Sequence, residues 1–167
     1  MTARRELSLD DLAGLVDALR GAGAAAPVYR AVEALSGEVV GHRLFTIMRF
    51  DVAQAEVERV HSSMPAVYPV GGRKAKKETA WSDHTLRDMK VFRASGADAI
   101  RAAFEDHATI LSLGLASVLN IPLVLGGRCI GTMNLLHEAG WYTPEDEPTG
   151  LLIGAFLLPV LAHRPIA

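Results

Sequence analysis

The strongest constraint on the fold of this chain is a pair of apolar stretches joined by two glycines. Residues Ser117–Leu125 (SVLNIPLVL) lead into Gly126-Gly127, and Arg128–His137 (RCIGTMNLLH) follow. A Gly-Gly pair between two strand-forming runs is a strong turn signal, so the sequence predicts a β-hairpin here. Pro122 cannot donate a backbone hydrogen bond, which places its strand at a sheet edge or at a bulge.

A second hairpin is predicted closer to the N-terminus. Leu44–Phe50 (LFTIMRF) is rich in residues that favour strands, and Glu56–Ser63 (EVERVHSS) alternates like a half-exposed partner strand. Alternation along the first strand places Met48 and Phe50 on one face of the sheet and Arg49 on the other. The sequence leaves open which of these faces lines a binding site.

Helices are predicted at both ends of the chain and once between the hairpins. Apolar spacing and helix-ending glycines predict them at about residues 9–21, 27–37 or 27–41, 97–107 and 144–162, with one further turn capped by Ser82. The most apolar stretch, Gly150–Ala162, is shorter than the roughly 20 residues of a membrane span. We expect it to be buried, in the core or against a second subunit. Paired strands with helices at both ends indicate an α+β fold with an antiparallel sheet and its terminal helices on one face.

Composition narrows the class of protein. The 167 residues suit one domain over residues 1–167, and 50% of them are hydrophobic, which supports a full core. The one cysteine, Cys129, excludes an internal disulfide framework and a multi-cysteine zinc site. The net charge of −2 argues against a dedicated nucleic-acid-binding protein. The N-terminal segment lacks the apolar core of a signal peptide, so we expect a cytoplasmic protein with no membrane partner.

The stretch Ser117–His137 resembles the C-terminal hairpin of GAF domains, and the order of the other elements agrees with that family over about Leu9–Ala162. The resemblance implies an antiparallel sheet of about five or six strands. It also implies terminal helices that often form a dimeric bundle, and a ligand pocket on the opposite face under residues 65–115. The family's ligands range from cyclic nucleotides, tetrapyrroles and haem to small anions, amino acids and 2-oxo acids. The cofactor and the ligand are therefore left unknown.

Some activities found among similar proteins are not expected here. Free methionine-R-sulfoxide reductases resemble this chain in length, but their chemistry needs a nucleophilic thiolate and a resolving cysteine. Residues 111–119 contain no cysteine, and Cys129 is interpreted as a small strand residue. The variable segment also lacks a cysteine for a bilin, and the Asn-Lys-x-x-x-Phe-x-x-x-Asp-Glu pattern of cyclic-nucleotide-binding members is absent.

The segment over the predicted pocket supplies the candidate ligand-binding residues. A basic run follows Gly71-Gly72, and within it Arg73 and Lys77 could hold a carboxylate or phosphate, although a solvated loop would look the same. Trp81 could stack on a flat ligand or pack the segment onto the sheet. Arg49 could meet an anion if its side of the strand faces the pocket.

Histidines and a carboxylate complete the candidate set. His84, Asp106 and His107 fall in the same segment, where they could touch a ligand or act as structural polar groups. None of the six histidines has a metal-binding spacing, so no metal is predicted.

We therefore predict a stand-alone GAF-like domain that binds a small molecule, with anions among the candidates, and that forms a homodimer through its terminal helices. One alternative is a small enzyme with His107 or His84 as general base and Asp106 as a second acid or base. The other is a ligand-free dimerisation module.

Overall fold

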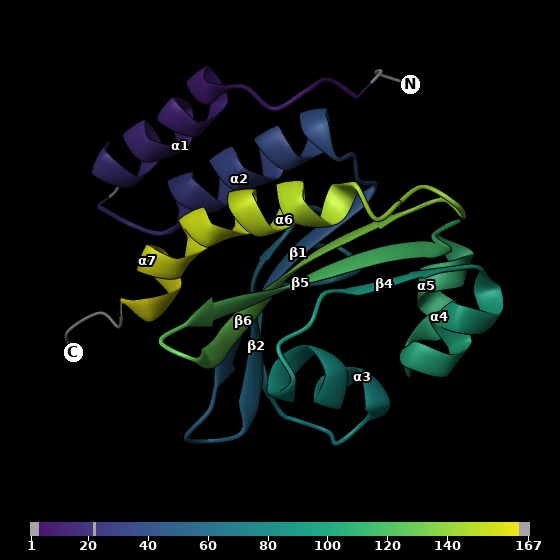
Figure 1. The fold of residues 1–167 in the computed structure, drawn as a ribbon. Coiled ribbons are helices and arrows are strands. Elements are labelled where there is room, and N and C mark those ends of the chain that lie inside the picture. The colour runs from purple at the N-terminus through teal and green to yellow at the C-terminus, as the bar shows by residue number, and fades with distance from the viewer. Residues whose placement is uncertain (1–3, 22, 164–167) are drawn as a thin grey trace.

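Six strands form one antiparallel sheet at the centre of the fold (Figure 1). The structure, a computed structural model, describes residues 4–21 and 23–163. The strand order is β3-β2-β1-β6-β5-β4, and each neighbouring pair is antiparallel. The strands are β1 (Leu44–Asp51), β2 (Glu56–Ser62), β3 (Gly71–Ala75), β4 (Phe92–Ser95), β5 (Ser117–Leu125) and β6 (Arg128–His137).

Helices lie on both faces of this sheet. They are α1 (Leu9–Gly21), α2 (Ala26–Val39), α3 (Ala80–Ser82), α4 (Ala97–Ala103), α5 (His107–Ser112), α6 (Asp146–Gly154) and α7 (Leu158–Ala162), with a π-helical turn η1 (Asp83–Arg87) and a 3₁₀ turn η2 (Ala155–Leu157). The terminal helices α2, α6 and α7 cover one face, here called the helix face, and α1 packs outside α2 (Figure 1). The other face, here called the cavity face, is covered by α3, α4, α5 and the segments that join them (Figure 1). The predicted α+β class and the predicted placement of the terminal helices are confirmed.

The main hydrophobic core fills the helix face. Fully buried side chains of the sheet, such as Ile47 and Ile121, meet Val32 of α2 and Ile153 of α6 there. Helix α6 approaches β5 closely at Gly150, where an added Cβ would lie 2.7 Å from Ile121 Cδ1. No helix in the described ranges combines the length and the apolar character needed to cross a membrane.

Both predicted hairpins are present. Gly126 and Gly127 form the β5–β6 turn with φ of +59° and +75°, the left-handed conformation that such two-residue turns require. Strand β4 pairs with β5 only as far as Asn120. β5 is an inner strand rather than the predicted edge strand, but Pro122 lies beyond the last β4 pair, where that side of β5 has no partner strand.

The segment over the cavity face differs from the prediction. The helix predicted at residues 97–107 is broken because Phe104 is extended, with φ −128° and ψ 132°, so α4 and α5 are separate. Thr79, rather than Ser82, is the N-cap of α3. The short strands β3 and β4 were not predicted. Near the C-terminus, η2 interrupts the predicted apolar helix between α6 and α7.

Candidate functional site

A row of polar side chains crosses the cavity face on three neighbouring strands. Asn120 of β5 is paired with Asn134 of β6, which is paired with Thr46 of β1. Asn120 Nδ2 donates to Asn134 Oδ1 at 2.9 Å, and Asn134 Nδ2 donates to Thr46 Oγ1 at 3.2 Å. These three residues, here called the polar row, are at most 7% exposed. Their bonds satisfy groups that would otherwise be costly to bury.

Trp81 of α3 fixes the direction of the polar row. Its indole Nε1–H donates to Asn120 Oδ1 at 2.8 Å. An indole nitrogen donates but cannot accept. Asn120 must therefore turn its oxygen toward Trp81 and its amide nitrogen toward Asn134. Asn134 is oriented in the same way, with its oxygen toward Asn120 and its amide nitrogen toward Thr46. The Thr46 oxygen is therefore the last acceptor in this series of hydrogen bonds.

The polar row forms one wall of a cavity of about 180 Å³. Much of the remaining lining is apolar: Leu44, Met48, Phe104, Ile110 and Leu136. Arg59, Tyr68 and Asp106 add polar groups at another part of the wall. A largely apolar cavity with a few well-placed polar groups is the usual form of a small-molecule site.

Tyr68 and Asp106 lie between this cavity and an outer groove. The Tyr68 hydroxyl donates to Asp106 Oδ2 at 3.0 Å, and the Arg59 Cζ lies 5.1 Å from the centroid of the Tyr68 ring. Burial and the Asp106 carboxylate raise the pKa of Tyr68, so its hydroxyl remains a donor at neutral pH. All three residues also line the groove, together with Lys74 and Thr109.

Two of the predicted site residues line the cavity, and the two histidines do not. Trp81 and Asp106 contribute to its wall. His84 lines a separate groove that Trp81 also lines, and its Nε2 lies 2.9 Å from the backbone oxygen of Val91. His107 is the first residue of α5 and is not among the residues that line the cavity.

The predicted cationic residues also lie outside the cavity. Gly71 begins β3, an exposed edge strand, so Arg73 points to solvent and lies 3.6 Å from Glu56 in an ion pair. Lys77 is 68% exposed and forms an ion pair with Glu105 at 2.7 Å. Arg49 lies on the helix face near Leu161 of α7. The sequence left open which face of β1 lines the binding site, and the structure places Arg49 on the face opposite the cavity. None of the three lines the cavity, and a role for any of them in binding a ligand stays a prediction.

The residues that sequence reasoning missed are Arg59, Tyr68 and the polar row. Two β-bulges explain most of this. Counting back from the Gly126-Gly127 turn places Asn120 opposite Met133, but the register shift beyond Leu123 moves it opposite Asn134. The signal in the sequence was one asparagine inside each of two apolar strands, Asn120 and Asn134, which indicates a buried polar pair.

The second bulge brings Arg59 into the cavity. Thr46 of β1 pairs with Ser62 of β2 and Ile47 pairs with His61, but Met48 pairs with Arg59, which leaves Val60 as the extra residue. Simple alternation from Ser62 would send Arg59 to the helix face. The bulge turns it to the cavity face beside Met48, and bulges commonly re-aim side chains in this way.

Comparison with solved structures identifies the fold. The GAF domain of a phosphoenolpyruvate-protein phosphotransferase from Coxiella burnetii has a TM-score of 0.75 and 16% identity, covering 93% of this chain and 92% of that chain. The chain has the GAF fold. The GAF domain of the Acinetobacter phosphoenolpyruvate-protein phosphotransferase gives 0.74 at 14% identity, covering 95% of each chain. No family model matches the sequence, and no curated protein matches it.

The GAF fold also appears in a solved enzyme, the free methionine-R-sulfoxide reductase from Neisseria meningitidis in complex with its substrate. That structure has a TM-score of 0.64 and 12% identity, covering 97% of this chain and 96% of that chain. At such identities the likeness is one of fold. The resemblance to GAF domains that the β5–β6 hairpin predicts is therefore confirmed for the fold.

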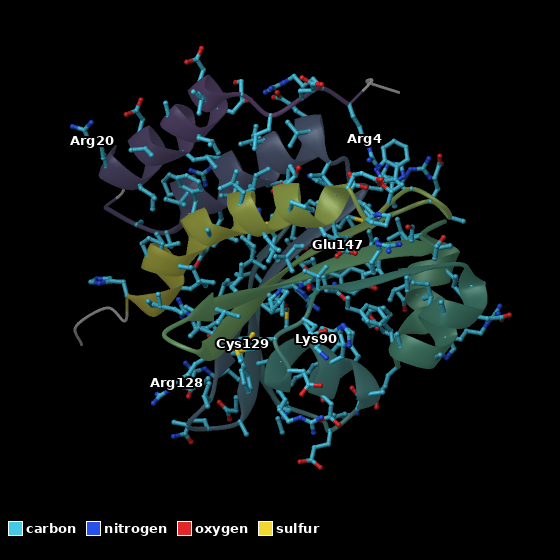
Figure 2. The ribbon with its side chains drawn as sticks, viewed as in Figure 1. Arg4, Arg20, Lys90, Arg128, Cys129 and Glu147 are labelled. Carbon is cyan, nitrogen blue, oxygen red and sulfur yellow. The ribbon has the colours of Figure 1, made fainter. Side chains whose placement is uncertain are left out.

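Cys129 is poorly placed for thiol chemistry on this scaffold. It lies beside Arg128 at the turn end of the β5–β6 hairpin (Figure 2). It is not among the residues that line the cavity. Cys129 is 3% exposed, and its thiol donates to the backbone oxygen of Gly131 at 3.2 Å. Burial raises its pKa, so it is a weak nucleophile at neutral pH. Within residues 4–21 and 23–163, no three His, Cys, Asp or Glu side chains form a group that could hold a metal ion.

Proposed function

We propose that this chain is a sensory domain of the cytoplasm that binds a small molecule in the cavity beside the polar row. The observation that carries the proposal is the combination of a cavity of about 180 Å³ with a wall of buried, hydrogen-bonded polar side chains. A cavity of about 150 Å³ can hold a benzene ring, so the expected ligand is about that size and carries one polar group. Trp81 and Asp106 are proposed to line the ligand site.

Ligand binding would act on the segment that covers the cavity. Trp81, Tyr68, Phe104 and Asp106 all come from this segment, whereas the polar row belongs to the sheet. A ligand that contacts both would favour the closed arrangement of the segment, and a partner protein could detect that change.

Native mass spectrometry of the freshly purified protein tests this function. We expect the folded protein to carry an additional small mass that disappears under denaturing conditions, or to acquire one from a library of small acids, amides and amines. A Trp81→Ala variant should bind the same compound more weakly. A folded protein that carries and acquires no such mass would contradict the proposal and would favour the ligand-free dimerisation module.

We also propose that the protein is a homodimer through its terminal helices. Leu9 and Val16 of α1 are 83% and 42% exposed, and Leu151 and Leu152 of α6 are 47% and 45% exposed. Isolated exposed apolar residues are ordinary, but several on the terminal helices of one domain suit contact with another subunit.

Light scattering after size-exclusion chromatography tests the dimer. The wild-type protein should have the mass of a dimer, and the Leu151→Glu/Leu152→Glu variant should be a monomer because two charges would be buried without partners. Val70→Glu is the matched control, since Val70 is 54% exposed and precedes β3, away from the terminal helices. A wild-type monomer, or a dimer that tolerates both glutamates, would contradict this assignment.

A further inference from the structure

The polar row leaves its last donor without an acceptor. Thr46 Oγ1 accepts from Asn134, so the Thr46 proton must be donated elsewhere. Among the residues that the structure describes, no group accepts it. Thr46 is 6% exposed and lines the cavity. A buried hydroxyl in this position offers a hydrogen-bond donor to whatever occupies the cavity.

The amides of the polar row offer donors as well. Each Asn side chain carries two N–H groups. Asn120 and Asn134 each use one of them along the row, while their oxygens are already acceptors for Trp81 and Asn120, respectively. The second N–H of each amide has no acceptor among the described side chains and backbone groups. The wall formed by the polar row therefore has unused donors, which suit a ligand with acceptor atoms.

Arg59 adds a positive charge that lacks a protein counter-ion. Three arginines in the described part of the chain are half-buried: Arg4, Arg49 and Arg59. Arg4 has an ion pair with Asp146 and Arg49 has one with Glu58, but no carboxylate forms an ion pair with Arg59 in the described ranges. Its Nη1 donates to the backbone oxygen of Pro69, while its Nε is buried and has no partner. A buried N–H of a charged group is costly to leave without an acceptor.

Asp106 does not supply this missing partner. It is the one carboxylate on the cavity wall, but it is exposed at the side of the outer groove and accepts from the Tyr68 hydroxyl. Asp106 accepts no hydrogen bond from the Arg59 Nε–H or from the Thr46 hydroxyl, so both donors remain without an acceptor within the part of the chain that the structure describes.

We propose that the cavity recognises a small carboxylate, and that Arg59 and Thr46 bind its oxygens. This inference rests on the proposed ligand-binding function and names the chemical class of the ligand. The Arg59 guanidinium supplies the positive charge, the Thr46 hydroxyl supplies a donor fixed by the polar row, and the apolar lining holds the rest of the molecule. The bulge at Val60 is the backbone feature that brings Arg59 to this site.

Calorimetric titration of the full chain with matched acids and amides tests the inference. The probes are benzoate with benzamide and butyrate with butyramide, because each amide keeps the shape of its acid and loses the charge. The wild-type protein should bind each acid at least about tenfold more tightly than its amide, as expected for hydrogen bonds to charged groups. Arg59→Met should weaken acid binding about 10- to 100-fold and change amide binding little.

Further variants separate recognition from simple structural damage. Thr46→Val should weaken acid binding about three- to tenfold, whereas Thr46→Ser keeps the hydroxyl and should bind nearly as the wild type does. Arg73→Met is the matched charge control, since Arg73 is exposed on β3 outside the cavity. Cooperative thermal unfolding of each variant shows that it is folded.

The possible results distinguish this inference from the proposed function. Amides that bind as tightly as their acids, or an Arg59→Met variant that keeps full acid affinity, would overturn the carboxylate assignment and leave a ligand-binding domain in place. Failure of both acids and both amides to bind the wild type would also overturn it. The native mass spectrum would then decide separately whether the cavity binds another compound.

Discussion

Replacing Gly131 by alanine is expected to lower the free energy of unfolding by about 2–4 kcal/mol. Gly131 lies in β6, where it is paired with Arg49 of β1 and Leu123 of β5. A Cβ added there would overlap the backbone oxygen of Met48, and Leu161 Cδ1 would lie 3.2 Å away on α7. Because the Met48 oxygen belongs to a strand backbone, the overlap cannot be relieved by rotating a side chain.

Urea unfolding of the Gly131→Ala variant measures this effect, and the chain contains a matched control. Gly14 is an exposed residue in the middle of α1, and an added Cβ there meets nothing within 4 Å. Gly14→Ala should therefore raise the free energy of unfolding by about 0.5–1 kcal/mol, because alanine favours the helix more than glycine does. A Gly131→Ala protein as stable as the wild type would show that β1 and β6 are not joined as closely as described.

Replacing Asn134 by leucine is expected to have the second large effect, a loss of about 2–4 kcal/mol of stability. The side chains are similar in size, but leucine removes the middle of the polar row. The Asn120 amide then loses its acceptor, Thr46 loses its donor, and both remain buried. The variant should also bind ligand weakly, because Thr46 is no longer oriented.

A double-mutant cycle with Asn120→Leu tests whether the row acts as a unit. Each single variant leaves a buried partner unsatisfied, whereas the double variant removes both amides together. The double variant should therefore lose clearly less stability than the sum of the two single variants. Simple additivity in urea unfolding would mean that the two amides do not depend on each other.

The elements that sequence could predict are those with strong local signals. Gly126-Gly127 specifies the β5–β6 turn, and apolar periodicity specifies α1 and α2. Strands β3 and β4 have five and four residues, and GGRKA in β3 is fully exposed. Such short segments lack a local strand signal and depend on pairing with β2 and β5.

The candidate site was harder to predict because it depends on register. Two side chains from the covering segment, Trp81 and Asp106, were predicted and line the cavity. Arg49 was considered from alternation along β1, but the arginine that lines the cavity is Arg59 of the partner strand. The sequence contains no separate signal for the bulge at Val60. A shift of one residue exchanges the faces of all residues beyond it, so the choice between these arginines depends on tertiary pairing.

The most direct test of the ligand-binding cavity is the NMR spectrum of the two tryptophan indoles. Trp81 Nε1–H donates to Asn120 in the cavity wall, whereas Trp141 Nε1–H donates to the Val40 backbone at 2.9 Å and is not among the residues that line the cavity. Substituting Trp81 by phenylalanine assigns the two resonances. During titration with benzoate, the Trp81 resonance should shift until saturation while the Trp141 resonance stays in place. A spectrum in which Trp81 does not respond to benzoate, butyrate or any compound found by native mass spectrometry would contradict the central claim.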